Sequence, residues 1–238
     1  MERLQTMRDN KYITKIVAAC LLGDGCVSRD GETTPGQNSR FQLSMTEKNR
    51  DHIEYIQERI EPISRTNIRL HTREVENAKD GLSRQDQLRL VGGRHPFYTN
   101  FRNRMYPHGY KVVDPHYLTL VDWEFLAILF QQDGTLVHSY ANKKYLNYAV
   151  SIATLNFSYG DNMLMKKAFK EKLGLEWNVS PTTKNGKRMW FLRLMNKQLF
   201  QFIDGVMPYI QPSFMYKTDL SHGLPLWATK GDDIVGSA

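Results

Sequence analysis

The chain contains two apolar, helix-length runs that each end in Asp-Gly, and this internal repeat constrains its fold more than any other feature. The first run reads ITKIVAACLLGDG over residues 13–25, and the second reads DWEFLAILFQQDG over residues 122–134. Their aspartates, Asp24 and Asp133, are 109 positions apart. A glycine directly after an apolar run is typical of a helix end. The sequence therefore predicts two equivalent helices that each present an aspartate at the C-terminal end.

The segments that follow the two runs also correspond to each other. Alternating apolar and polar residues come first, then an amphipathic helix, then a second alternating region. We expect the amphipathic helices at residues 47–61 and 158–173, with Ile53 buried in the first and Leu164 buried in the second. The aromatic residues that close each half, Phe200 among them, are also expected in the core. Each half is therefore predicted to be α+β, with a sheet that has one apolar face and one polar face.

Each half closes on an aromatic helix, prolines and a lysine. Lys111 follows Asp24 by 87 positions, and Lys217 follows Asp133 by 84. Two matches in the same order and at nearly equal spacing indicate a tandem pseudo-repeat. The proline-containing stretch VVDPHYLTL is the natural linker between the halves. The predicted first half, linker and second half cover residues 1–111, 112–121 and 122–238.

Charge and cysteine usage narrow the class of protein. The formal net charge is +7, which favours a polyanionic partner, although many basic proteins bind no nucleic acid. The two cysteines, Cys20 and Cys26, form neither a disulfide framework nor a zinc-binding pattern, and Cys20 is expected to be a small buried residue. No apolar stretch is long enough to span a membrane, and the N-terminus lacks the apolar core of a signal peptide. We therefore expect an intracellular protein.

The two runs resemble the signature of the LAGLIDADG homing endonucleases, in the form that carries both motifs on one chain. VAACLLGDG (17–25) matches in its apolar, small-residue helix and its final Asp-Gly, and LAILFQQDG (126–134) matches also at its opening Leu-Ala. The earlier aspartate of the family motif is replaced by Leu22 and Gln131. The last acidic residue, which carries the chemistry across the family, is present in both motifs. The resemblance covers nearly the whole chain, because the surrounding repeat fits as well.

The resemblance implies an α+β fold of two pseudo-symmetric αββαββα halves. The motif helices would pack together at the interface, and the two antiparallel sheets would form a DNA-binding saddle. Small residues such as Ala18 and Ala127 would let the helices approach closely. This packing would bring Asp24 and Asp133 together at a pseudo-twofold axis.

The resemblance further implies hydrolysis of one phosphodiester on each strand of a long DNA site, which leaves 3′ overhangs. Carboxylates at helix C-termini, where unpaired carbonyls carry partial negative charge, suit hard cations such as Mg²⁺, with Mn²⁺ as a substitute. Such metals activate water and stabilise the leaving oxygen. We expect Asp24 and Asp133 to be catalytic and to bind the metal together with Gly23 and Gln132.

Lys111 and Lys217 lie where single-chain family members carry basic residues near the active sites. We expect them to stabilise developing negative charge or to position water in each half. The polar strand faces would lie in the major groove, where Arg and Gln suit bidentate contacts with base edges. The candidate DNA-contacting residues are Arg40, Gln42, Arg69, Arg73, Gln85, Gln87, Arg89, Lys143, Asn147, Ser151, Lys187 and Arg193.

Two other functions on the same fold stay open at the level of the sequence. An RNA-binding maturase would assist splicing by binding intron RNA, and a basic surface away from the saddle would support it. A DNA-binding protein that no longer cuts is disfavoured, because both aspartates are intact. A basic α+β protein with no nucleic-acid role is disfavoured by the repeat. Since one chain already supplies two half-sites, we expect a monomer that binds double-stranded DNA and no membrane.

Overall fold

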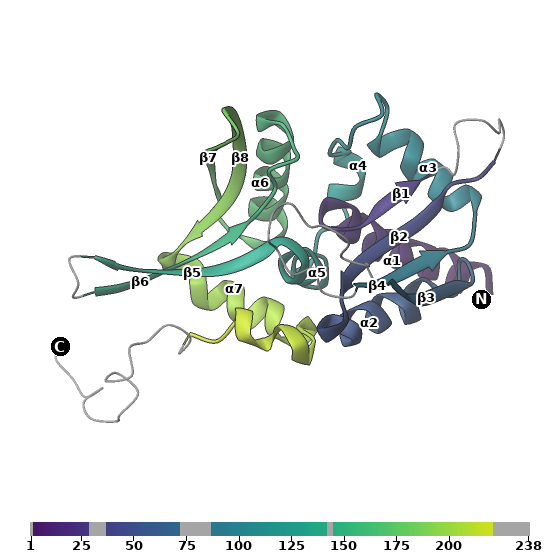
Figure 1. Cartoon of the computed structure of the whole chain (residues 1–238), viewed down its shortest axis with the longest axis horizontal. Coiled ribbons are helices and arrows are strands. Elements are labelled where there is room, and N and C mark those ends of the chain that lie inside the picture. Colours follow the sequence, from purple (N-terminus) through teal and green to yellow (C-terminus); the bar gives the residue numbers. More distant parts are fainter. Residues whose placement is uncertain (1, 29–36, 72–86, 142–144, 221–238) are drawn as a thin grey trace, which may run out of the picture.

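The computed structural model describes residues 2–28, 37–71, 87–141 and 145–220 of the chain, which form two successive halves of the same αββαββα order (Figure 1). The elements of the first half are α1 (Glu2–Leu22), β1 (Cys26–Ser28), β2 (Arg40–Thr46), α2 (Arg50–Ile60), β3 (Thr66–His71), β4 (Gln87–Gly92) and α3 (Pro96–Met105). The elements of the second half are α5 (Trp123–Asp133), β5 (Gly134–Ala141), β6 (Tyr145–Ile152), α6 (Tyr159–Leu173), β7 (Asn178–Lys184), β8 (Lys187–Met195) and α7 (Leu199–Val206). The predicted α+β fold with two pseudo-symmetric halves is confirmed.

A short helix, α4 (Pro115–Leu118), lies inside the stretch expected to link the halves. The domain boundaries at residues 1–111, 112–121 and 122–238 stay a prediction. The 3-10 helices are η1 (Glu47–Asn49), η2 (Asn196–Gln198), η3 (Met207–Tyr209) and η4 (Pro212–Lys217). Within the part of the chain that the structure describes, no helix is long and apolar enough to cross a membrane.

Each half contains one four-stranded antiparallel sheet. The strand orders are β1-β2-β4-β3 and β5-β6-β8-β7, which are the same order in the two halves. Along β2 and β4 the apolar side chains of Phe41, Leu43 and Leu90 are buried, while the residues between them are half-buried. Since successive side chains of a strand point to opposite faces, the first sheet covers the core with one face and turns a polar face outward.

Helices α1 and α5 form the centre of the molecule, with one sheet on either side of the pair (Figure 1). The small residues Ala18, Ala19 and Ala127 are fully buried in the common core. Because alanine side chains are short, the two helix backbones can approach closely at these positions. The packing brings the C-terminal ends of α1 and α5, and hence the two Asp-Gly sequences, to the same place.

Two side chains expected in the core lie on the surface instead, so these predictions were wrong. Leu164 is 36% exposed, while Met165 and Phe169 of the same helix are fully buried. Phe200 is 67% exposed, while Phe202 in α7 is fully buried. Adjacent residues of an α-helix point about 100° apart. An apolar residue one or two positions away therefore occupies the core position that the pattern alone assigned to Leu164 or Phe200.

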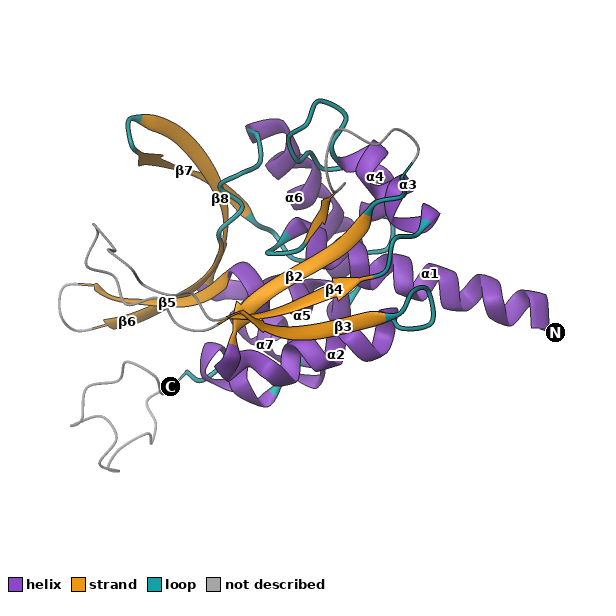
Figure 2. Cartoon of the chain, turned by 45° about the vertical axis from the view of Figure 1, so that its right-hand side comes forward, coloured by secondary structure: helices purple, strands orange, loops and turns teal. Residues whose placement is uncertain are grey.

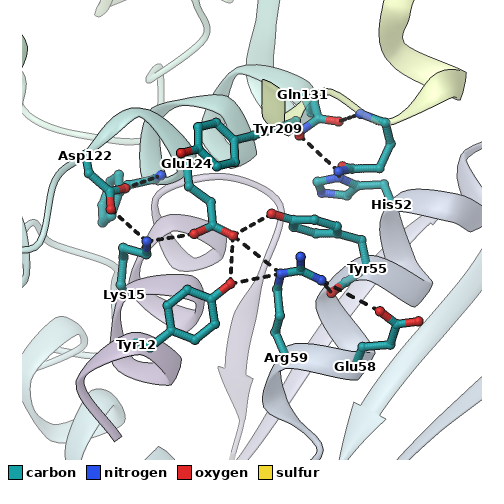
Figure 3. A network of polar contacts seen from close by, with 12 residues as sticks. Tyr12, Lys15, His52, Tyr55, Glu58, Arg59, Asp122, Glu124, Gln131 and Tyr209 are labelled. Carbon is teal, nitrogen blue, oxygen red and sulfur yellow. Dashed lines mark hydrogen bonds and ion pairs between the residues drawn. The ribbon is translucent and has the colours of Figure 1, made fainter. Parts of the chain in front are cut away.

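A buried carboxylate joins the halves near the start of α5. The side chain of Glu124 is 7% exposed, and its carboxylate accepts hydrogen bonds from Tyr12 Oη at 2.8 Å and Tyr55 Oη at 2.5 Å. Lys15 Nζ lies 2.7 Å from the other carboxylate oxygen, and Arg59 Nε lies 3.4 Å from the first (Figure 3). All four partners belong to α1 and α2 of the first half. Glu124 is thus paired and hydrogen-bonded, as a buried charge requires.

Lys15 and Glu124 are 109 positions apart, the same separation as the two aspartates. They are therefore equivalent positions of the repeat that meet across the pseudo-twofold axis. Lys15 Nζ also lies 2.7 Å from Asp122, which begins α5 by accepting a hydrogen bond from the backbone N–H of Phe125. The same lysine thus fixes both the start of α5 and its position against α1.

Removal of the Glu124 charge should destabilise the fold. We expect Glu124→Gln to lower the free energy of unfolding by about 3 kcal/mol, because the positive charges of Lys15 and Arg59 would stay partly buried without the negative charge that now pairs with them. Chemical denaturation of the full chain measures the change. Glu171→Gln is the control, since Glu171 pairs with Lys167 at 3.8 Å on the exposed side of α6 and should contribute less than about 1 kcal/mol. Equal effects of the two variants would contradict this role of Glu124.

Candidate active site at the ends of the motif helices

Asp24 and Asp133 occupy slightly different places at the ends of their helices. Asp133 is the last residue of α5. Asp24 lies two residues beyond the end of α1, in a turn where the N–H groups of Gly23 and Gly25 both donate to the carbonyl of Cys20, at 3.0 and 2.8 Å. Leu22 and Gln131, which replace the earlier aspartates of the two motifs, are both buried in the core.

The two carboxylates and the two predicted lysines form one electrostatic cluster. Although Asp24 is exposed at the surface, the protein around its carboxylate removes part of the water and raises its pKa, which Lys111 and Lys217 oppose. Burial, together with repulsion from Asp24, raises the pKa of Asp133 to about 6, again against the two lysines. Each acid therefore responds to the charges of both halves, which means that the fold brings all four groups together.

The lysines bind the carbonyls at the helix ends. Lys111 Nζ donates to the carbonyl oxygens of Gly23 at 3.0 Å and Gly25 at 2.9 Å. Lys217 Nζ donates to the carbonyl of Gln131 at 2.7 Å. These cations offset the partial negative charge of the helix C-termini. Burial lowers the pKa of Lys111 and lowers that of Lys217 to about 8, so both ammonium groups are held in a poorly solvated place.

Gln132 reaches across from α5 to the first motif. Its Oε1 accepts the backbone N–H of Asp24 at 2.9 Å, and its Nε2 lies 3.4 Å from Cys20 Sγ and 3.3 Å from His52 Nε2. Cys20 is buried, as expected. His52 is fully buried in α2 and was not identified from the sequence, because one histidine in an amphipathic helix shows no spacing pattern. The sequence named Gln132 only as a metal-binding residue, and these side-chain contacts were not predicted.

The site contains oxygen ligands of the kind that Mg²⁺ prefers. Among the described residues, no three His, Cys, Asp or Glu side chains gather as a metal-binding group. Asp24 and Asp133 nevertheless offer two carboxylates beside the carbonyl oxygens of Gly23 and Gln132. Mg²⁺ is commonly held by one or two carboxylates plus phosphate oxygens and waters, so these residues fit a metal that binds together with a nucleic acid.

Figure 2 shows the two sheets. Most of the candidate DNA-contacting residues lie on their strands, at positions that alternate with the buried core residues and therefore face outward. Those with described side chains are Arg40, Gln42, Arg69, Gln87, Arg89, Ser151, Lys187 and Arg193, all half-buried or exposed. Asn147 of β6 pairs with Ser139 of β5, and the side chain of Asn147 is outside the described part of the structure. The remaining three, Arg73, Gln85 and Lys143, lie outside the described residues.

The outward face of the first sheet carries a row of residues in direct register. Arg69 of β3 lies opposite Arg89 of β4, and Arg89 lies opposite Ser44 of β2. Like charges directly opposite each other destabilise a sheet. In the second sheet Arg193 lies between Ser151 and Asn178, and its buried Nε has no hydrogen-bond partner in the part of the chain that the structure describes. Both rows offer positive charge to a bound anion.

Two αββαββα halves with acidic helix ends at their junction define the fold of LAGLIDADG nucleases. The LAGLIDADG DNA endonuclease family matches residues 14–202, and the chain belongs to this family. A relative in Methanocaldococcus jannaschii, the uncharacterized protein MJ1098, is 28% identical over 203 residues, which cover 85% of this chain and 71% of the relative. Membership of the family supports a DNA endonuclease function.

Solved structures share the fold. The homing endonuclease I-WcaI bound to its DNA recognition sequence superposes with a TM-score of 0.69 at 20% identity, over 87% of this chain and 86% of that chain. A variant of I-DmoI, described in complex with its target DNA in the presence of Mg, has a TM-score of 0.50 at 12% identity, over 84% and 98%. At these identities the likeness shows the fold alone.

The raised pKa of Asp133 predicts a pH-dependent effect on stability without metal. The folded-state value of about 6 exceeds the ordinary 3.8, so the ionised carboxylate costs stability above pH 6 and costs nothing below pH 4. We expect Asp133→Asn to stabilise the protein at pH 8 by up to about 3 kcal/mol, and not at pH 4. Thermal unfolding in EDTA measures this. Asp204→Asn, at an exposed position of α7, is the control, and a less stable Asp133→Asn protein at pH 8 would contradict the assignment.

Proposed function

We propose that this protein is a site-specific double-stranded DNA endonuclease that hydrolyses one phosphodiester on each strand with a divalent metal. The observation that carries the proposal is the meeting of Asp24, Asp133, Lys111 and Lys217 at the ends of α1 and α5, between the two outward sheet faces. Mg²⁺ is the proposed cofactor and Mn²⁺ its substitute. The family membership and the fold support this assignment, and a monomer suffices because both acids belong to one chain.

Each acid and each lysine has a distinct part in the proposed mechanism. Asp24 and Asp133 would hold the metal, with the carbonyls of Gly23 and Gln132 beside them. When bound, a divalent metal would supply an activated water and stabilise the attacking and leaving oxygens. Because the acids repel each other, a cation bound at this site would lower their pKa values and relieve that repulsion. The carboxylates are thereby arranged to take up positive charge.

Lys111 and Lys217 supply positive charge in each half. In the free protein their ammonium groups bind helix-end carbonyls, next to where a scissile phosphate would approach the acids. A short movement would let each ammonium donate to a phosphate oxygen as negative charge develops there. The pseudo-twofold arrangement matches two phosphates on opposite strands, and we propose that the product has 3′ overhangs.

The outward faces of the sheets are the proposed DNA-binding surface. The opposed pair Arg69 and Arg89 is unfavourable in the free sheet, and bases or phosphates between the two side chains would compensate it. Arg and Gln can read guanine and adenine edges in the major groove. We propose that the described candidate residues on both sheets, together with Asn147, make these contacts. Arg73, Gln85 and Lys143, which lie outside the described residues, are proposed to contact DNA as well.

Cleavage of a randomised duplex library tests the proposal. We expect the purified protein with Mg²⁺ to cut a long, defined site, and EDTA to abolish cleavage. Asp24→Asn and Asp133→Asn should each lower the cleavage rate at least about 100-fold, because each removes a metal ligand. Asp204→Asn is the matched control and should cut normally. Binding of structured intron RNA or of uncut DNA, with no cleavage by the wild-type protein, would instead favour the maturase or the inactive binder.

Removal of Arg89 should separate DNA binding from stability. We expect Arg89→Ala to weaken binding to the cognate site by about 1–3 kcal/mol while leaving the melting temperature unchanged or raised, because it also relieves repulsion with Arg69. Fluorescence anisotropy and thermal unfolding measure the two effects. Lys167→Ala, on the exposed side of α6, is the control and should bind normally. A loss of stability with unchanged DNA affinity would contradict the proposed role of Arg89.

A further inference from the structure

The two catalytic aspartates differ in what holds their backbone. Asp133 is the last residue of α5, so its N–H belongs to the hydrogen-bond ladder of its own helix. Asp24 lies beyond the end of α1, and its N–H donates to Oε1 of Gln132 on the other motif helix at 2.9 Å. The position of Asp24 therefore depends on a side chain of the opposite half, whereas the position of Asp133 does not.

The contact between Asp24 and Gln132 requires a glycine. Gly23 and Gln132 are equivalent positions of the repeat, 109 apart, yet one has no side chain and the other has a long one. A Cβ atom on Gly23 would lie 2.4 Å from Oε1 of Gln132, which is too close. The missing side chain in the first motif thus makes room for the amide from the second.

A chain of hydrogen bonds fixes the orientation of this amide. The backbone N–H of Asp24 can only donate, so the Gln132 atom that faces it must be the oxygen, and Nε2 must point to His52. His52 Nε2 then accepts at 3.3 Å, and His52 Nδ1–H donates to Oε1 of Gln211 at 2.7 Å. Burial lowers the pKa of His52 to about 4, which keeps the ring neutral and able to accept.

This series of hydrogen bonds ends in a buried part of the second half. The backbone N–H of Gln211 donates to Oε1 of Gln131 at 2.8 Å, and the amide of Gln131 donates to the carbonyls of Ala127 and Tyr209, both at 3.1 Å. Both glutamines are buried. The support of the Gln132 amide therefore lies within the core, away from solvent that could compete for its hydrogen bonds.

We propose that Gln132 and His52 are positioning residues for the Asp24 active site alone, so that their loss slows cleavage of one DNA strand more than the other. The inference rests on the proposed nuclease function and deepens it. Gln132 acts by fixing the backbone of Asp24, and His52 acts by fixing Gln132. Because Asp133 is held by its own helix, the second site keeps its geometry when this chain of hydrogen bonds is broken.

Strand-specific cleavage rates test the inference. The two ends of a cognate duplex carry different labels, and single-turnover rates are measured for each strand at saturating Mg²⁺. Lys111 binds the carbonyls on both sides of Asp24, so Lys111→Met should slow the strand that is cut at the Asp24 site more than the other strand. This variant therefore identifies which strand the Asp24 site cuts. We expect Gln132→Ala and His52→Phe to slow that strand at least about tenfold more than the other. Gln201→Ala, which removes an amide from the exposed side of α7, should change neither rate.

Gly23→Ala provides a second route to the same result. It keeps Gln132 but displaces its amide by steric contact, so the same strand should be slowed even if Gln132→Ala folds poorly. Equal slowing of both strands by these variants would overturn the inference, because a purely structural role has no strand preference. A wild-type protein that cuts neither strand would instead refute the proposed function, and the two failures are thus distinguishable.

The tautomer of His52 gives a readout that does not depend on cleavage. In the full chain with ¹⁵N-labelled histidine, we expect the NMR shifts of His52 to show a protonated Nδ1 and an unprotonated Nε2 at pH 7. Gln132→Ala should shift the Nε2 resonance, because it removes the donor to that nitrogen. A His52 ring protonated at Nε2 would overturn the hydrogen-bond chain even if the nuclease were active.

Discussion

The packing of α1 against α5 is the constraint on which the rest of the molecule depends. The two helices form the core common to both halves, and their C-terminal ends decide where the acids meet. Close approach is possible because small side chains line the contact, and the buried carboxylate of Glu124 fixes the helices near the start of α5. The sheets are attached to this pair, so the place where the two acids meet and the spacing of the outward sheet faces are set together.

The same packing creates a site that is electrostatically unfavourable when it is empty. Two carboxylates converge where helix-end carbonyls already carry negative charge. Burial, together with repulsion from Asp24, raises the pKa of Asp133 to about 6. Lys111 and Lys217 compensate only in part, at the expense of their own hydration. Charge that is poorly satisfied in the free protein would favour the metal and phosphate binding that we propose. The opposed arginines of the first sheet place a similar contact between like charges on its outward face.

Repetition made the fold and the positions of the two motif aspartates predictable, while the contacts between the halves were not predictable. The Asp-Gly runs and the alternating segments specify local structure, and each of these patterns occurs in both halves of the sequence. The role of His52 depends on an amide from a residue 80 positions away, and no local pattern reports such a contact. Leu164 and Phe200 show a related limit, because periodicity identifies an apolar face but leaves an uncertainty of one residue in which side chain fills the core.

The pairing of unlike residues at equivalent positions has an evolutionary consequence. Two copies of the first half on the same axis would set Lys15 against Lys15 and leave an empty space between two copies of Gly23. Two copies of the second half would set Glu124 against Glu124 and force two Gln132 side chains into a space that holds one. If the two halves arose by duplication of one sequence, they have since diverged at these positions, so that neither half alone presents a surface suited to a symmetric homodimer.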